Sequence, residues 1–217
     1  MTPTGVALRD AREQLFDAAE RVLLRSGPSA LTSRAVTTEA GCAKGVLHRH
    51  FVDFDAFLAE LVQDRIGRIE AQAVALRESA GAGASAGIGG ASTDEGGART
   101  VTDNLADALT TVFGSVALEI VALIISRDEL RARLRQQRPT GLPLMTEAVA
   151  MLAGYLAAER DLGRIAPDAD VDMLARTLIG TGHLLFAGRE GDAPDADEVR
   201  WLVISVIGGV VQGAESL

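Results

Sequence analysis

Residues 31–51, LTSRAVTTEAGCAKGVLHRHF, contain two short segments of helical character separated by Gly41. Thr32 suits the N-cap of the first helix, predicted over 33–40, because a hydroxyl there can accept a hydrogen bond from a free backbone N–H. Gly41 can adopt the left-handed conformation that ends a helix without steric cost. The second helix is predicted over 42–50. Two helices that meet at such a tight turn are a common means of presenting one helix to the major groove of DNA.

The second predicted helix is short and polar, and it carries the only lysine of the chain, Lys44. Lys44 and His48 are four residues apart and therefore share one helix face, with Arg49 one step round it. Thr32 and His50 are expected near phosphates. The full set of residues predicted to contact DNA is Thr32, Arg34, Ala43, Lys44, Gly45, Leu47, His48, Arg49 and His50.

A longer stretch, from Arg12 to about Leu58, resembles the tetracycline-repressor-like (TetR-like) family of transcription regulators. REQLFDAA at 12–19 and LLRSG at 23–27 are similar to the family's first helix and its terminating glycine. LTSRAV at 31–36 and EAG at 39–41 are similar to its second helix and turn. KGVLHRHF at 44–51 falls where its recognition helix and closing aromatic residue lie. The ordered set at the family's spacing is far more specific than any single fragment.

The resemblance implies an all-α protein with an N-terminal three-helix helix-turn-helix head that binds DNA. A larger C-terminal helical domain would serve ligand binding and dimerisation. The predicted division is 1–53 and 54–217, with 79–99 as a flexible loop because it consists almost entirely of Gly, Ala and Ser. A simple connector is favoured for this loop, and a functional lid is the alternative. Three positions depart from the family's usual residues: His48 replaces tyrosine, Thr37 replaces alanine, and Phe54 replaces a lysine that commonly touches a DNA phosphate.

The bulk composition is that of an ordinary globular protein, with 47% hydrophobic and 24% charged residues among 217. The single cysteine, Cys42, excludes an internal disulfide and suits a reducing compartment. We expect a cytoplasmic protein with no membrane segment, because no signal-peptide pattern is present and the longest apolar run, 201–211, is too short to span a bilayer. The net charge of −9 opposes DNA binding, but residues 31–51 hold three basic residues against one acidic.

Helical periodicity dominates the rest of the chain, and no alternating strand pattern or repeat is present. The helices predicted outside the DNA-binding motif are 8–26, 54 to about 76, 101–126, 127–137, 144–159, 170–186 and 195–212. The last of these begins with Asp195 three residues before Glu198, which resembles a capping box.

Enzymatic and metal-binding functions have little support. Common catalytic motifs such as G-x-S-x-G, H-E-x-x-H and G-x-x-x-x-G-K-[ST] are absent. His48 and His50 are two residues apart, so they cannot share one helix face for a metal, and Cys42 falls where the family buries a small apolar residue. We therefore predict no enzyme, no cofactor and no metal.

A ligand pocket is predicted around His183, which lies inside an apolar helix. Large adaptable side chains on other helices complete an apolar site with few polar groups, the usual composition of a small-molecule pocket. The predicted ligand-binding residues are Phe113, Met145, Met151, Tyr155, His183, Phe186 and Trp201. Plain core packing is the alternative explanation for each of them.

Two further patterns each allow two interpretations. The arginines between 127 and 138 could bind an anion, but nearby acids favour a solvated face. The last two helices carry an apolar stripe from Val199 to Val211 that is wider than one core contact needs, with Gly208 and Gly209 permitting close helix approach. The family resemblance implies that these helices form a homodimer through a four-helix bundle, and burial within the monomer is the rival explanation.

Together these features predict a DNA-binding transcriptional regulator. We expect a repressor that binds an inverted-repeat, double-stranded operator as a dimer and is released by a small, mostly apolar effector. The alternative is a helical ligand-binding protein or enzyme that retains a vestigial DNA-binding head, which the loss of the lysine at position 54 would favour.

Overall fold

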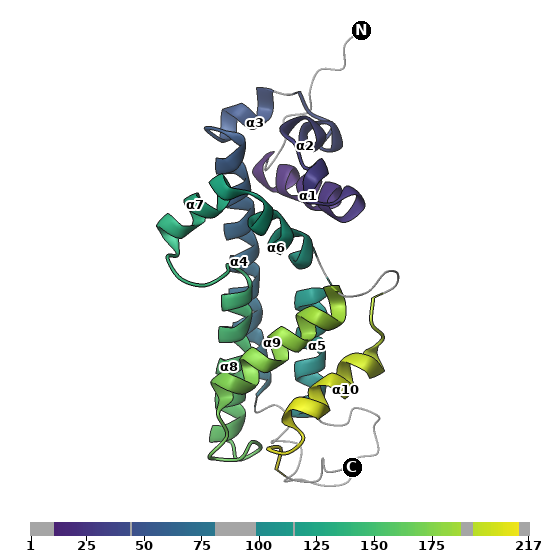
Figure 1. Ribbon diagram of the computed structural model, residues 1–217, viewed down its shortest axis with the longest axis vertical. Helices are drawn as coiled ribbons and strands as arrows, with labels where there is room; N and C mark the ends of the chain where they lie inside the picture. The colour runs from purple at the N-terminus through teal and green to yellow at the C-terminus, as the bar shows by residue number, and fades with distance from the viewer. Residues whose placement is uncertain (1–10, 44, 81–98, 115, 188–192, 213–217) are drawn as a thin grey trace. The chain divides into compact units, whose positions relative to one another are not determined.

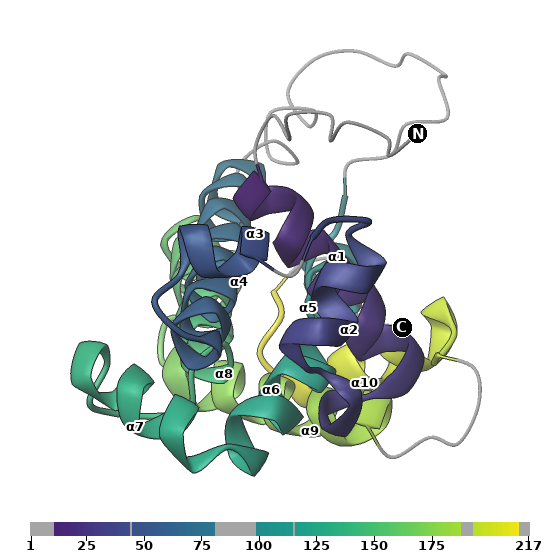
Figure 2. The same ribbon diagram turned by 90° about the horizontal axis from the view of Figure 1, so that it is seen from above.

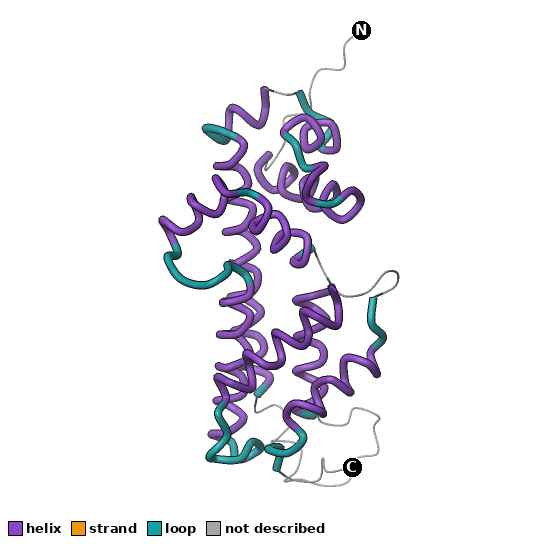
Figure 3. The backbone as a smooth tube through the Cα atoms, in the orientation of Figure 1, coloured by secondary structure: helices purple, strands orange, loops and turns teal. Residues whose placement is uncertain are grey.

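The computed structural model describes residues 11–43, 45–80, 99–114, 116–187 and 193–212. In this part of the chain the regular structure is helical, apart from one isolated bridge between Ile165 and Val211 (Figure 3). The predicted all-α class is therefore confirmed. Most of the predicted loop, 81–98, lies outside the described residues, as does Lys44.

Packing divides the chain into two units. The first unit comprises 1–65 and 116–143, and the second unit comprises 66–115 and 144–217. The boundary by packing thus lies inside a helix at 65/66 rather than at 53/54. Residues 116–143, expected in the C-terminal domain, pack with the first unit.

The first unit is built around the N-terminal helices (Figure 1). Its elements are α1 (Ala11–Ser26), the short 3-10 helix η1 (Pro28–Ala30), α2 (Ser33–Glu39), α3 (Gly45–His50), the start of α4 (Phe54–Ser79), α6 (Ala117–Ser126) and α7 (Asp128–Gln137). Three aromatic rings, those of Phe16, Phe51 and Phe57, pack with centroids 5.0–6.0 Å apart and join α1 and α4 to the residue that follows α3. Helix α6 packs against η1 and α1, which explains why 116–143 belongs to this unit (Figure 2).

The second unit contains the remainder of α4 together with α5 (Val101–Phe113), α8 (Met145–Asp161), α9 (Val171–Ala187) and α10 (Ala196–Ile207). Helix α9 contacts α8, α5 and α10, and α10 also contacts α5. Helix α8 runs beside α4, where a Cβ on Gly154 would lie 3.3 Å from the Arg77 guanidinium. Largely aliphatic side chains from these helices fill the core.

Two predicted helices differ from the structure. The single helix over 101–126 is instead α5 and α6, separated at Gly114, whose N–H donates to the Thr110 carbonyl at 2.7 Å. A Cβ at Gly114 would lie only 2.5 Å from that carbonyl oxygen, so a tight helix end needs glycine there. The last predicted helix, 195–212, ends at Ile207, and the following residues pair with the turn after α8.

Of the described helices, none is by itself both long and apolar enough to cross a membrane. Only the broken pair α5 and α6, taken together, reaches the length and composition of a span.

Candidate nucleic-acid interface and pocket

The helix-turn-helix segment forms through local hydrogen bonds. The Thr32 hydroxyl accepts a hydrogen bond from the Ala35 N–H at 3.1 Å, which confirms Thr32 as the N-cap of α2. Gly41 has φ +65°, the left-handed conformation that the sequence predicted for it. Helix α3 begins at Gly45 rather than at 42, so the turn is longer than expected.

Helix α3 is anchored by one buried side chain and exposes its last turn. Leu47 is fully buried, whereas His48, Arg49 and His50 are exposed. The Leu47 side chain therefore holds α3 to the head, and only the backbone of this residue is left for the predicted contact with DNA. The remaining described residues of the predicted set, Thr32, Arg34, Ala43 and Gly45, are exposed.

Two arginines of α1 hold α2 in place. Arg21 and Arg25 each donate to the Glu39 carboxylate at 2.9 Å. These two hydrogen bonds hold the pKa of Glu39 below its ordinary value. The pair of ionic contacts fixes the C-terminal end of α2, from which the turn to α3 starts.

The start of α4 is held by two arginines, Arg133 of α7 and Arg127 immediately before α7. Asp53 caps α4 by accepting from the Ala56 N–H at 2.6 Å, and Arg133 of α7 donates to its other oxygen at 2.9 Å. The backbone hydrogen bond, supported by Arg133, lowers the pKa of Asp53. The Arg127 guanidinium lies 5.4 Å from the centre of the Phe54 ring. Thus two of the arginines expected on a solvated face make contacts inside the first unit.

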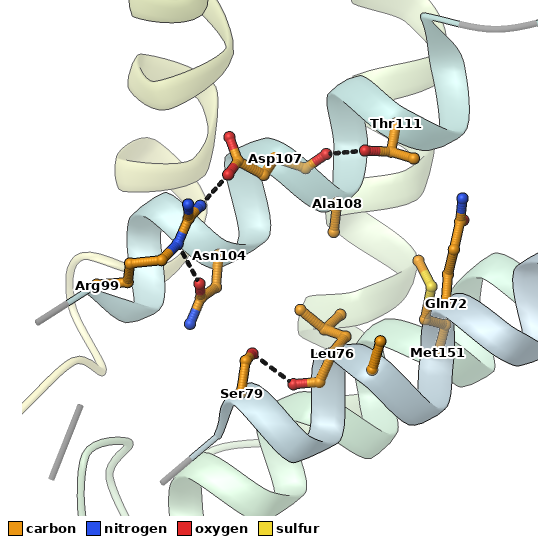
Figure 4. Close-up of a pocket in the computed structure, with 10 residues that line it drawn as sticks. Gln72, Leu76, Ser79, Arg99, Asn104, Asp107, Ala108, Thr111 and Met151 are labelled. Atoms are coloured by element: carbon orange, nitrogen blue, oxygen red, sulfur yellow. Dashed lines mark hydrogen bonds and ion pairs between the residues drawn. The ribbon is translucent and has the colours of Figure 1, made fainter. Parts of the chain in front are cut away.

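A pocket of about 290 Å³ lies in the second unit (Figure 4). Its apolar lining comes from α4, α5 and α8: Ala75, Leu76, Ala108 and Met151. Its polar lining comes from α4, from α5 and from the residue preceding the α5 cap: Gln72, Ser79, Arg99, Asn104, Asp107 and Thr111. Arg99 bonds both Asn104, at 3.0 Å, and Asp107, so one wall of the pocket is a connected polar group.

Of the predicted ligand-binding residues, Met151 lines this pocket. Tyr155 is fully buried and is not among the pocket-lining residues. Its hydroxyl accepts a hydrogen bond from the amide nitrogen of the lining residue Asn104 at 3.0 Å. Trp201 is 72% exposed on α10. Met145 is half-buried at the start of α8 and is not among the pocket-lining residues.

Phe113, His183 and Phe186 form a separate cluster between α5 and α9. The Phe113 ring lies 6.1 Å from the His183 ring and 5.6 Å from the Phe186 ring. Gly182 permits this approach, because a Cβ there would lie 2.8 Å from the Phe113 ring. These residues pack two helices together and do not line the pocket described above.

Sequence reasoning missed the polar wall of the pocket. It selected large apolar side chains, while Arg99, Asn104 and Asp107 are ordinary surface types in sequence. One local signal was available: Thr100 and Asp103 form a capping box that starts α5. That cap fixes the start of α5, and so it sets the positions of Asn104 and Asp107, about one and two turns further along the helix.

The region that contains this helix-turn-helix matches a known family model. Residues 15–61 match the model of bacterial regulatory proteins, tetR family. Residues 15–61 therefore carry the DNA-binding domain of the TetR family of transcriptional regulators. The chain is accordingly a DNA-binding regulator, and because the TetR family is non-enzymatic, the prediction that the chain is not an enzyme is confirmed.

Solved structures of other transcription regulators share the fold over nearly the whole chain. A Mesorhizobium loti protein described as a TetR-family regulator is 15% identical, with a TM-score of 0.64 over 93% of this chain and 96% of that one. SmeT, the repressor of the Stenotrophomonas maltophilia efflux pump SmeDEF, is 17% identical, with a TM-score of 0.59 over 95% and 93%. FadR from Bacillus subtilis, solved with stearoyl-CoA, is 16% identical, with a TM-score of 0.58 over 91% and 98%. No curated protein is similar enough to the chain to count as a match.

Proposed function

We propose that this TetR-family protein is a ligand-responsive repressor that binds an inverted-repeat operator as a homodimer. The observation that carries the DNA-binding part is the exposed turn His48–His50 of α3, anchored by buried Leu47 within a capped helix-turn-helix. Thr32, Arg34, Ala43, Lys44, Gly45, His48, Arg49 and His50 are the proposed DNA contacts. Basic and histidine side chains of this kind donate to phosphates and base edges.

We propose that α9 and α10 form the dimer contact. Each helix packs in the core through one face and leaves another face open. On α9 the open face carries Met173, Thr177, Gly180 and Leu184, and on α10 it carries Trp201, Ile204, Ser205 and Gly208. Their spacing of three and four residues forms a stripe along each helix, as helix–helix packing requires.

The proposed effector is a small, mostly apolar molecule with one hydrogen-bonding end. The pocket volume of about 290 Å³ suits a small molecule. Its apolar lining would hold the body of the molecule, and the Arg99–Asn104 wall would hold the polar end. Under this proposal residues 1–53 bind DNA, and 54–217 bind the effector and form the dimer. Such a regulator acts in the cytoplasm.

A mobility-shift assay with the DNA flanking the protein's own gene, together with a random operator library, tests the function. We expect binding to an inverted repeat and release by one or more hits from a thermal-shift ligand screen. Failure to bind either DNA would refute the regulator and favour a ligand-binding protein with a vestigial head. Tight DNA binding that no stabilising ligand weakens would refute the effector part alone.

The face of α3 is tested by Arg49→Ala. Loss of one phosphate contact should weaken binding to all sequences alike and reduce the salt slope by about one unit. Arg135→Ala, which removes an exposed arginine of α7, is the matched control for the loss of one positive charge. Equal effects of the two changes would mean that net charge, rather than the face of α3, determines affinity.

A further inference from the structure

The polar wall of the pocket continues into the protein through Asn104. This side chain is 6% exposed, and both ends of its amide are engaged. Its oxygen accepts from Arg99 Nε at 3.0 Å, and its nitrogen donates to the Tyr155 hydroxyl at 3.0 Å. Asn104 therefore connects the surface of the pocket with a residue that is completely buried on α8.

The next residues along this path are Tyr155, the buried carboxylate of Glu159 and the partly exposed Arg164. The Tyr155 hydroxyl interacts with the Glu159 carboxylate one turn along α8; burial and then this contact raise the pKa of Tyr155. Glu159 is fully buried, and its Oε2 lies 2.5 Å from Arg164 Nε. Within the described residues, neither Glu159 oxygen has a well-aligned hydrogen bond, and the same holds for Arg164 Nε and Nη2.

Arg164 belongs to the turn between α8 and α9, and that turn holds the chain beyond α10. The Arg164 carbonyl accepts from the Gln212 N–H at 2.8 Å, and the Ala166 N–H donates to the Val210 carbonyl at 2.8 Å. Ile165 and Val211 form the bridge between these two bonds. The C-terminal end of α10 is thus fastened to the residue that neutralises Glu159.

Stability alone does not account for this path. Burying the Glu159 carboxylate beside Arg164, whose side chain is 24% exposed, has a large desolvation cost, and well-packed apolar residues of similar volume are often as stabilising as such an ion pair. An incompletely hydrogen-bonded buried network is costlier still, because each unsatisfied group loses its hydration.

We propose that Asn104, Tyr155, Glu159 and Arg164 form a polar relay that couples the pocket to the C-terminal end of α10. This proposal rests on the proposed function, because it concerns how that pocket acts on the proposed dimer helix. A polar group bound beside Asn104 competes with Tyr155 for the amide. Tyr155 and Glu159 then rearrange, Arg164 moves with Glu159, and the bonds from 164–166 to 210–212 loosen.

A double-mutant cycle without DNA or effector tests the coupling. Asn104→Ala removes the contact between the pocket wall and Tyr155, and Glu159→Gln removes the negative charge that pairs with Arg164. The readout is the hydrogen-exchange rate of the Gln212 and Ala166 amides, measured by NMR in the full chain. We expect Asn104→Ala to speed exchange at both amides by roughly three- to tenfold in the wild-type background and to have little further effect in Glu159→Gln.

Thr111→Val is the matched control, because Thr111 also lines the pocket but its hydroxyl, among the described residues, bonds only the Asp107 carbonyl. It should leave Gln212 and Ala166 unchanged. The amides of Leu178 and Ile179 in the core of α9 report general loosening and should also be unaffected by Asn104→Ala. If Glu159→Gln does not fold, Tyr155→Phe interrupts the relay with little change of volume and replaces it in the cycle.

Additive effects of the two substitutions, or no response at Gln212 and Ala166 to Asn104→Ala, would overturn the relay. Equal acceleration at Leu178 and Ile179 would overturn it as well, since the effect would then be general destabilisation. These outcomes are independent of the mobility-shift assay. A chain that binds no DNA refutes the proposed function while the cycle still reports whether the pocket and α10 are coupled.

Discussion

At the residue scale, Thr32 connects the sequence of the helix-turn-helix directly to its structure. Its hydroxyl satisfies a backbone N–H that no residue within α2 can reach. Helix α2 has only seven residues, so one cap is a large part of its local stability. The cap depends on a single side-chain oxygen that serine also has and alanine lacks.

We expect Thr32→Ala to lower the free energy of unfolding by about 1 kcal/mol. Thr32→Ser should retain most of the stability, and Thr38→Ala, at an exposed position of the same helix, should have a smaller effect. Urea unfolding followed by circular dichroism measures all three. A Thr32→Ser loss as large as that of Thr32→Ala would show that the methyl group, and not the cap, is important.

Glu39 makes the head sensitive to acid. Arg21 and Arg25 lower its pKa in the folded state, so its ion pairs stabilise the fold above the ordinary value of 4.5. That contribution is lost as the pH falls below 4.5 and through the lowered native pKa. We therefore expect the stability difference between wild type and Glu39→Gln to be constant near neutral pH and to shrink in acid.

Urea unfolding at a series of pH values measures this difference. Glu78→Gln, which removes an exposed carboxylate near the end of α4, is the control for the loss of one negative charge. A Glu39→Gln difference that grows as the pH falls would contradict the sign of the lowered pKa.

At the scale of elements, α10 has two faces with different tasks. Val199, Val203 and Ile207 are buried in the second unit, and Arg200 pairs with Asp103 of α5. Trp201 and Ile204 point away from that core, with 72% and 36% exposure. A helix fixed on one side and apolar on the other is suited to packing against a second copy.

We expect Ile204→Asp to weaken the dimer by at least about tenfold, because an aspartate buried in an apolar contact loses its hydration. Analytical ultracentrifugation over a concentration series measures the dissociation constant. Leu162→Asp, which introduces the same charge at an exposed site beyond α8, should leave the dimer intact. Equal weakening by both substitutions would argue against α10 as the contact.

At the scale of the whole molecule, one recognition helix reads few base pairs, so specific binding requires two heads. A twofold dimer should set them about 34–36 Å apart, one helical turn of DNA. An effector can change that spacing only through its different affinities for the two arrangements. In the proposed function, dimer geometry is what connects the pocket to the operator.

Trp201, the only tryptophan, reports assembly directly. Its side chain is largely exposed in the single chain, so dimerisation through α10 should shift its emission to shorter wavelength. We expect a return to longer wavelength on dilution, at the concentration where sedimentation shows dissociation. A dimer that dissociates with no change in emission would place the contact elsewhere.

Much of the head could be predicted because its determinants are local. The hydroxyl of Thr32 and the left-handed backbone of Gly41 each act within a few residues, as does the capping pair Asp195–Glu198 at the start of α10 in the second unit. Helical periodicity predicted the extent of α4, α8 and α9 within a few residues, and it agreed with the all-α class that the family resemblance implied. Boundaries were less accurate where a non-local contact ends a helix, as at Ile207.

Only the tertiary structure decided which residues meet across long separations. Residues 116–143 pack with the N-terminal helices, and Arg133 donates a hydrogen bond to Asp53. Leu47 is buried, whereas the following residues 48–50 are exposed. The tertiary structure also determined that polar residues of α5 line the pocket, and that Tyr155 contacts the lining residue Asn104 without lining the pocket itself. Helix caps and helical periodicity depend on interactions between residues that are close together in the sequence, so they can be recognised from the sequence itself. A pocket arises from the packing of α4, α5 and α8, whose contacts depend on the whole fold at once.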